Sequence, residues 1–243
     1  MLFDIIHTSN SVAEIIIKIT LLVMVLSITF SIHEFMHAWV AERMGDDTPR
    51  HQGRITLNPI AHIDPFGAIM MLIAGFGWAK PVQYNPNNLT KHKRWVCERY
   101  ISLAGVFANY MMAILASFLL VLVSYIVLKN PASSEKGRFF QTLIIAFFFY
   151  LREYNFLFLA FNLLPVPPLD GYRFVSTFIP FKWRKTFDTY SQYSYYVFFA
   201  LLLLGRFGNV NVLATIVNWI AFPFRAPIDL LITQLGFKLI LGA

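Results

Sequence analysis

Long apolar runs are the feature of this sequence that most limits its fold. The first run, Val12–Val40, is interrupted only by Glu14 and Lys18 near its start. As a helix rising about 1.5 Å per residue, it exceeds the ~30 Å hydrocarbon core of a bilayer. The run therefore predicts a membrane-spanning helix.

Composition extends this prediction to the whole chain. The 243 residues are 57% hydrophobic and 14% charged, whereas soluble domains average roughly 25% charged residues. The formal net charge of +7 could indicate a nucleic-acid partner, but Lys and Arg also gather in the cytoplasmic loops of membrane proteins. We therefore expect a multi-pass membrane protein in contact with the lipid bilayer, with no nucleic acid as partner.

Further apolar segments set the expected number of spans. Tyr100–Leu128 and Phe139–Leu164 have the length of transmembrane helices, and another span is expected at about 190–206. Val210–Phe222 is a further apolar piece, and Ile228–Leu241 is short enough to lie in the membrane interface. The sequence predicts an all-α polytopic membrane protein with about five to six transmembrane helices.

A small irregular element is expected after the first helix. Arg54–Leu57, "RITL", could form a short strand. Phe66–Ala79 is apolar and glycine-rich but too short for a comfortable span. We therefore expect a small β-hairpin or re-entrant element here, buried in protein.

The chain is expected to form one membrane-embedded domain over residues 1–243. Its catalytic core would cover about 12–173, and its C-terminal helices about 190–243. Basic residues are much denser in 43–99 and 173–185 than in the loops of the opposite face. This asymmetry predicts a cell-membrane protein with that face in the cytoplasm and the N-terminus outside.

The first apolar run contains a metal-binding pattern, "HEFMH". His33 and His37 are four residues apart, so a helix places both imidazoles on one face, and Glu34 lies beside them. H-E-x-x-H on a helix is typical of zinc metalloproteases, with the glutamate as general base. Hydrogen-bonded histidines and a snorkelling glutamate are the simpler alternative. Three ionisable groups at one membrane depth are costly without a purpose, which favours a metal.

Catalytic zinc needs a third protein ligand. Asp170 fits best, because the spans return the chain to the face of His37 just before it, and the prolines of "NLLPVPPLDG" prevent the helix from continuing. Gly171 would permit an unusual backbone turn there. His62 and Asp64 remain the main alternatives, and the weaker candidates are His51 and His92.

Several motifs together resemble the site-2 protease family of intramembrane zinc metalloproteases, in its short bacterial branch without PDZ or CBS domains. They are "HEFMH", "GRITLNPIAHIDPFG", the "SLAG" helix with its asparagine, and "FNLLPVPPLDG", and they cover roughly Ser27–Arg173. "GVFAN" departs from the pattern, since relatives usually have proline after this glycine. The resemblance implies one zinc ion held by His33, His37 and Asp170, with Glu34 as catalytic base. It also implies that Asn109 and Asn162 lie near the active site.

The expected function is hydrolysis of peptide bonds in membrane-spanning substrates, which would be single-span proteins or peptides. Asn109 or Asn162 could stabilise the oxyanion or position the substrate. The alternatives are a non-proteolytic metal transporter, a CAAX prenyl endopeptidase and an inactive scaffold. Arg152 and Glu153 are adjacent in a span, where side chains of neighbours do not face each other. They are expected to line a polar groove or to pair with other helices.

Overall fold

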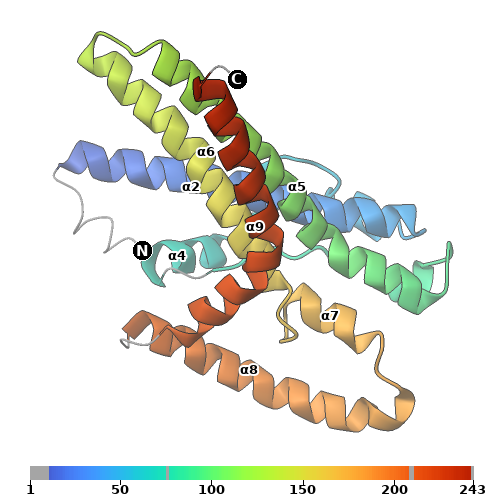
Figure 1. Ribbon diagram of the computed structural model, residues 1–243. Helices are drawn as coiled ribbons and strands as arrows, with labels where there is room; N and C mark the ends of the chain where they lie inside the picture. Colours follow the sequence, from blue (N-terminus) through green and yellow to red (C-terminus); the bar gives the residue numbers. More distant parts are fainter. Residues whose placement is uncertain (1–10, 75–76, 208–210, 242–243) are drawn as a thin grey trace.

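The computed structural model describes residues 11–74, 77–207 and 211–241 of the chain. This part of the chain is almost entirely helical and contains no β-strand; Ile63 and Ala79 form an isolated antiparallel bridge. Arg54–Leu57 is irregular, so the expected β-hairpin is not confirmed. The helices are α2 (Val12–Arg43), α3 (Thr48–His51), α4 (Pro65–Ala74), α5 (Arg94–Lys129), α6 (Glu135–Asn162), α7 (Asp170–Ser176), α8 (Arg184–Phe207) and α9 (Val212–Leu241) (Figure 1).

Within the described residues, four helices are long and apolar enough to cross a membrane: α2, α5, α6 and the part of α9 over Val212–Gly236. The expected five to six spans are therefore not confirmed. The segment at 190–206 is helical as part of α8, but the polar first half of α8 lowers the hydropathy of that helix.

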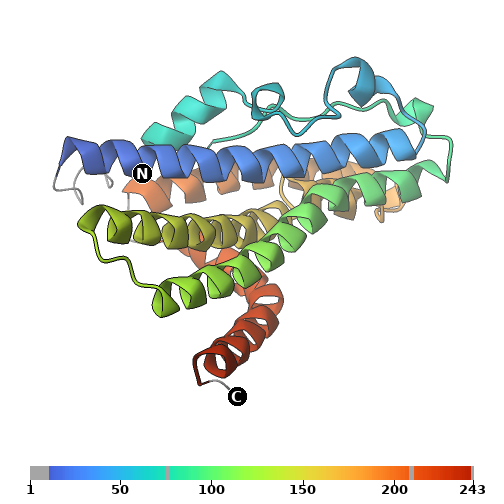
Figure 2. The ribbon, with the colours of Figure 1, turned by 90° about the horizontal axis from the view of Figure 1, so that it is seen from above.

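The last two apolar runs form one helix instead of two separate pieces. Pro223 and Pro227 lie inside α9, and each removes a backbone donor and disfavours a straight helix. Figures 1 and 2 show that α9 changes direction near its middle. The expected placement of Ile228–Leu241 as a separate interfacial segment is therefore not supported.

Helices α2, α5 and α6 lie side by side and form the centre of the molecule (Figure 2). Small residues allow their backbones to approach closely, as is common between membrane helices. The buried small residues on these helices are Ala38, Ala41, Ala104, Gly105, Ala108, Ala113, Ala116 and Ala160. This close packing brings the polar side chains of the three helices within hydrogen-bonding distance of one another.

The short helix α4 packs against the first half of α2. Met71 is buried in a cluster with Leu22 and Leu26, about two to three turns before His33 along α2. With ten residues, α4 is about 15 Å long and cannot cross a bilayer. It packs on a candidate spanning helix without being able to span itself, and the re-entrant interpretation stays a prediction.

The turn between α6 and α7 carries Asp170 back to α2. The prolines keep the segment Leu163–Leu169 non-helical, and Asp170 is the first residue of α7. Gly171 does not have the unusual backbone expected of it, because the only positive φ values among the described residues are at Gly45 and Gly53. Its missing side chain is needed for another reason: a Cβ would lie 2.3 Å from the Leu163 carbonyl oxygen.

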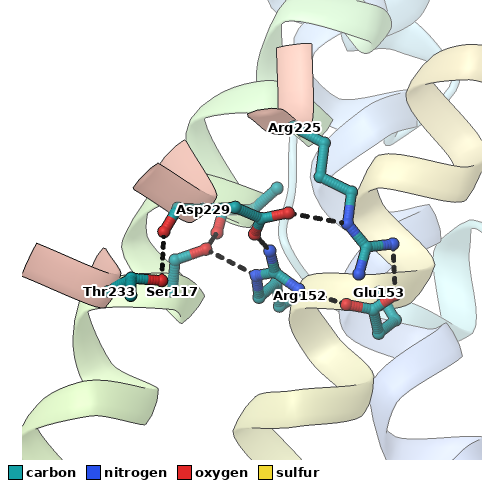
Figure 3. Close-up of polar contacts among 7 residues, drawn as sticks. Ser117, Arg152, Glu153, Arg225, Asp229 and Thr233 are labelled. Carbon is teal, nitrogen blue, oxygen red and sulfur yellow. Dashed lines mark hydrogen bonds and ion pairs between the residues drawn. The ribbon is translucent and has the colours of Figure 1, made fainter. Parts of the chain in front are cut away.

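A ring of charges joins α6 to α9 (Figure 3). Arg152 donates to Glu153 and Asp229, and Arg225 donates to the same two carboxylates at 2.8 and 3.2 Å. Arg152 also donates to the Ser117 hydroxyl of α5 at 3.1 Å. The inter-helix pairing expected for Arg152 is therefore found, although its direct bond to the adjacent Glu153 was not expected. Charges inside a membrane need such partners.

Asp46 fixes the end of α2 to the loop that precedes α5. Its carboxylate is buried and accepts hydrogen bonds from Thr48, from the Asn85 N–H at 2.6 Å and from the Asn88 amide at 2.9 Å. Burial alone would raise the pKa of this carboxyl, but the hydrogen bonds from Thr48, Asn88 and Asn85 bring the pKa below its ordinary value of 3.8. The ionised form therefore stabilises the fold.

We expect Asp46→Ala to lower the stability by about 2 kcal/mol, because several donors lose a charged acceptor. In a chain of this size that corresponds to a fall of about 4–8 °C in the Tm of the detergent-solubilised protein. The difference from wild type should be full above pH 3.8 and shrink as the pH falls through the lower pKa of the folded state. Asp47→Ala is the control, since the Asp47 carboxylate is exposed and makes no cap hydrogen bond. An equal effect of both substitutions would contradict this role for Asp46.

Candidate metal centre

Three side chains from two helices meet at one point. His33 and His37 lie one turn apart on α2, and their Nε2 atoms are 3.1 Å apart. The Oδ2 atom of Asp170 on α7 lies 3.2 Å from the His33 Nε2 and 3.0 Å from the His37 Nε2. All three residues are buried, and among the described residues they form the only group of three His, Cys, Asp or Glu side chains placed to hold a metal ion.

Hydrogen bonds behind the imidazoles determine which ring nitrogens face Asp170. The His37 Nδ1 lies 2.7 Å from the Ile101 carbonyl oxygen, which can only accept, so Nδ1 must carry the proton. The His33 Nδ1 lies 2.6 Å from the Asn109 Oδ1, which is also an acceptor. In the neutral imidazoles both Nε2 atoms are then unprotonated and present lone pairs to the Asp170 carboxylate.

This arrangement fits a cation. Two lone pairs and a carboxylate oxygen repel one another unless a positive charge lies between them, and the buried Asp170 Oδ2 has no hydrogen-bond partner. Ligands around tetrahedral zinc, at ~2.0–2.1 Å from the ion, are separated by about 3.3 Å, close to the observed 3.0–3.2 Å. Burial raises the pKa of the Asp170 carboxyl, but positive charge at the two Nε2 positions lowers that pKa below its ordinary value. Positive charge at this point therefore keeps the carboxyl ionised, as a metal ligand must be.

A glycine on α5 makes room for both imidazoles. A Cβ at Gly105 would lie 2.4 Å from the His37 Nε2 and 2.5 Å from the His33 Cε1. Real Cβ atoms do not approach other atoms so closely. Only glycine at this position leaves both rings free to face Asp170.

Glu34 lies beside the metal group and is held by the backbone. Its Oε2 accepts a hydrogen bond of 2.9 Å from the Val82 N–H, and the carboxylate is buried. A cavity of about 230 Å³ adjoins Glu34 and the three candidate ligands. Its other lining side chains are mostly apolar and include Phe30, Trp78, Tyr84, Ile101, Phe158, Phe161 and Asn162.

The two candidate asparagines have different positions. Asn162 lines the cavity, where its amide donates to the Phe158 carbonyl at 3.1 Å. Asn109 is buried behind His33 and does not line the cavity. Asn109 is thus placed to orient an imidazole, whereas only Asn162 is placed to contact a molecule in the cavity.

The alternative metal ligands are engaged elsewhere. The His62 Nε2 lies 2.8 Å from the Thr56 carbonyl oxygen, and the Asp64 carboxylate caps α4 by accepting from the Gly67 N–H at 2.7 Å. His51 and His92 are exposed. None of the four belongs to the metal group.

Several groups that build the site were not predicted from the sequence. The Ile101 carbonyl and the Val82 N–H are backbone groups, which no residue type reveals. Gly105 was noted as part of the "SLAG" motif and for the missing proline after it, but its contact with the two imidazoles was not predicted. Asn155 of α6, hydrogen-bonded to Asn109 at 2.8 Å, lies outside every motif considered.

Two buried histidines and a carboxylate around one point, with a glutamate beside them among apolar helices, are the side chains that a membrane-embedded metalloprotease needs at its site. Comparison with known families agrees. The chain belongs to peptidase family M50, the site-2 protease family, whose model matches residues 21–205.

Relatives support the same class. A Bacillus subtilis (strain 168) protein named "Putative zinc metalloprotease YwhC" is 40% identical over 182 residues, which are 75% of this chain and 80% of that protein. "Putative zinc metalloprotease Rip2" of Mycolicibacterium smegmatis is 31% identical over 180 residues, which are 71% of this chain and 62% of that protein. No solved structure matches the chain significantly. The protein is thus a multi-pass membrane protein of the zinc metalloprotease class.

Proposed function

We propose that the protein hydrolyses peptide bonds of membrane-spanning substrates, with one zinc ion held by His33, His37 and Asp170. The observation that supports this proposal best is the convergence of two Nε2 atoms and the Asp170 Oδ2 beside Glu34. The site opens into a cavity whose apolar walls suit an apolar polypeptide. A transporter would need further ligand sets along a path, and the described residues contain only this one.

Glu34, Val82 and Asn162 have different roles in the proposed reaction. Zinc, when bound, would polarise the scissile carbonyl and acidify a water molecule. The Glu34 carboxylate takes a proton from that water and later delivers it to the leaving amine. The Val82 N–H holds one oxygen of Glu34 and leaves the other oxygen for the proton. Asn162, at the cavity wall, can donate a hydrogen bond to the substrate carbonyl.

The substrate must unwind locally, since a transmembrane helix uses its backbone groups internally. Residues 80–85 run along the cavity without forming regular structure. The N–H groups of Val82 and Asn85 already have partners, but the backbone groups of Gln83 and Tyr84 make no hydrogen bond to another described residue and can pair with an extended substrate by strand addition. The dense basic residues of 43–99 and 173–185 favour a cytoplasmic position for this end of the molecule. We propose that water enters from that side and that the N-terminus lies outside.

Cleavage of a panel of single-span substrates by the detergent-solubilised protein tests this function. We expect cleavage that a zinc chelator abolishes and that added zinc restores. The same preparation in proteoliposomes should show no zinc flux. Zinc flux without cleavage of any substrate would favour the transporter, and cleavage that persists in the chelator would remove the metal from the mechanism.

Val82→Pro tests how Glu34 is held. Proline has no N–H, so the substitution deletes the donor to the Glu34 carboxylate. We expect kcat to fall about tenfold, the effect of one hydrogen bond to a charged group, with zinc content unchanged. Val82→Ala keeps the N–H and should lower kcat much less. Equal losses in the two variants would show that the Val82 side chain matters and its N–H does not.

A further inference from the structure

A row of hydrogen-bonded, buried amide side chains extends from His33 through α5 into α6. The Asn109 Oδ1 lies 2.6 Å from the His33 Nδ1, and the Asn109 amide donates to the Asn155 Oδ1 at 2.8 Å. The Asn155 amide donates in turn to the Leu151 carbonyl at 2.7 Å and to the Thr29 hydroxyl at 3.0 Å. Asn109, Asn155 and Thr29 are completely buried, so water cannot replace any of these partners.

The Leu151 carbonyl determines the orientation of both asparagine amides. A backbone carbonyl can only accept, so the Leu151 oxygen requires the NH₂ of Asn155 and turns the Asn155 oxygen toward Asn109. Asn109 must then present its NH₂ to Asn155 and its oxygen to His33. The Thr29 carbonyl, 3.4 Å from the Asn109 Nδ2, favours the same orientation.

The Asn109 oxygen determines which nitrogen of the His33 imidazole carries the proton. Facing an oxygen, the His33 Nδ1 must be the protonated nitrogen, which leaves Nε2 with a lone pair for the metal. In His37, the Ile101 carbonyl requires the proton on Nδ1 directly. His33 has no carbonyl at this position and depends on two asparagines, each of which could otherwise rotate by half a turn and offer the wrong group.

We propose that Asn155 is a positioning residue for the metal site, acting through Asn109 to hold His33 in its metal-binding tautomer and orientation. This proposal rests on the zinc site of the proposed function but not on proteolysis. The zinc dissociation constant of the full chain, measured by competition with a chelator, therefore tests it even if no substrate is cleaved.

Substitutions at Asn109 separate orientation from packing. Asn109→Asp keeps an oxygen for the His33 Nδ1–H and creates the carboxylate–histidine pair common around zinc, but its second oxygen faces the Asn155 oxygen, so we expect zinc affinity within about tenfold of wild type. Asn109→Leu fills the space but offers no acceptor, so we expect affinity to fall about 10–100-fold. A purely structural role would give the opposite order, because a buried carboxylate costs more than a buried leucine. Ser102→Ala is the control, because this buried serine of α5 is hydrogen-bonded, among the described residues, only to the Glu98 carbonyl; it should bind zinc as wild type does.

The decisive measurement is the effect of Asn155→Leu in two backgrounds. With Asn109 present, we expect Asn155→Leu to weaken zinc binding about tenfold, because the Asn109 amide loses the group that orients it. With Asn109→Asp, both carboxylate oxygens are acceptors and need no orientation, so Asn155→Leu should not weaken zinc binding further. Equal losses in both backgrounds would overturn the proposal, as would no loss in either. The Tm of each metal-free variant shows whether it folds; if Asn109→Leu does not fold, the Asn155 comparison alone decides.

Discussion

Gly105→Ala is expected to abolish high-affinity zinc binding while leaving the membrane fold intact. The new methyl group would lie 2.4 Å from the His37 Nε2 and 2.6 Å from the His33 Nδ1. Neither ring can withdraw, because His37 is bonded to Ile101 and His33 to Asn109 on the same helix that carries the methyl group. We therefore expect zinc affinity to fall about 100-fold or more, beyond the loss typical of groups that only orient a ligand.

Gly236→Ala is the matched control for this prediction. Gly236 lies in α9, and a Cβ there would meet nothing within 4 Å. Zinc content of the two purified variants, measured against wild type at one free zinc concentration, gives the comparison. If Gly105→Ala retained a full zinc equivalent, the imidazoles would not face the point at which the structure brings them together.

Glu34→Gln is expected to have the largest effect on turnover of the substitutions that leave zinc bound. Gln is nearly the same size and can still accept from the Val82 N–H, but it cannot take a proton from water. Loss of a general base lowers kcat by about 10²–10⁴-fold. Zinc content should be unchanged, because Glu34 is not one of the three candidate ligands.

Glu42→Gln makes the same chemical change on the same helix, away from the cavity. The Glu42 carboxylate pairs with Arg50 near the end of α2, so kcat should stay within about twofold of wild type. Cleavage by Glu34→Gln at a rate close to that of wild type would remove Glu34 from the mechanism. Loss of zinc together with activity would instead give Glu34 a structural role at the metal site.

The sequence predicted the helical fold and the metal group because both follow from strong local signals. Apolar runs longer than the bilayer core predict α2, α5 and α6, and the four-residue spacing places both imidazoles on one face. Asp170 could be predicted because the count of spans determines the side on which it emerges. His62 and Asp64 could not be excluded, since capping and ligation use the same residue types.

The C-terminal helices and the support of the site could not be predicted in the same way. The sequence predicted Val210–Phe222 and Ile228–Leu241 as two separate pieces, but α9 continues through Pro223 and Pro227. It is anchored at Arg225 and Asp229 by the ion pairs with α6. Asn155 and Gly105 act by contacts between helices far apart in the sequence. Such contacts depend on the crossing geometry of α2, α5 and α6, which no single segment encodes.

Zinc-edge X-ray absorption of the purified protein tests the central claim most directly. We expect one zinc per chain, with two imidazole ligands and oxygen ligands at about 2.0–2.1 Å and no sulfur. Asp170→Ala, prepared in parallel, should lose most of its zinc. A sulfur ligand at about 2.3 Å, or a full zinc equivalent with an unchanged spectrum in Asp170→Ala, would contradict the account.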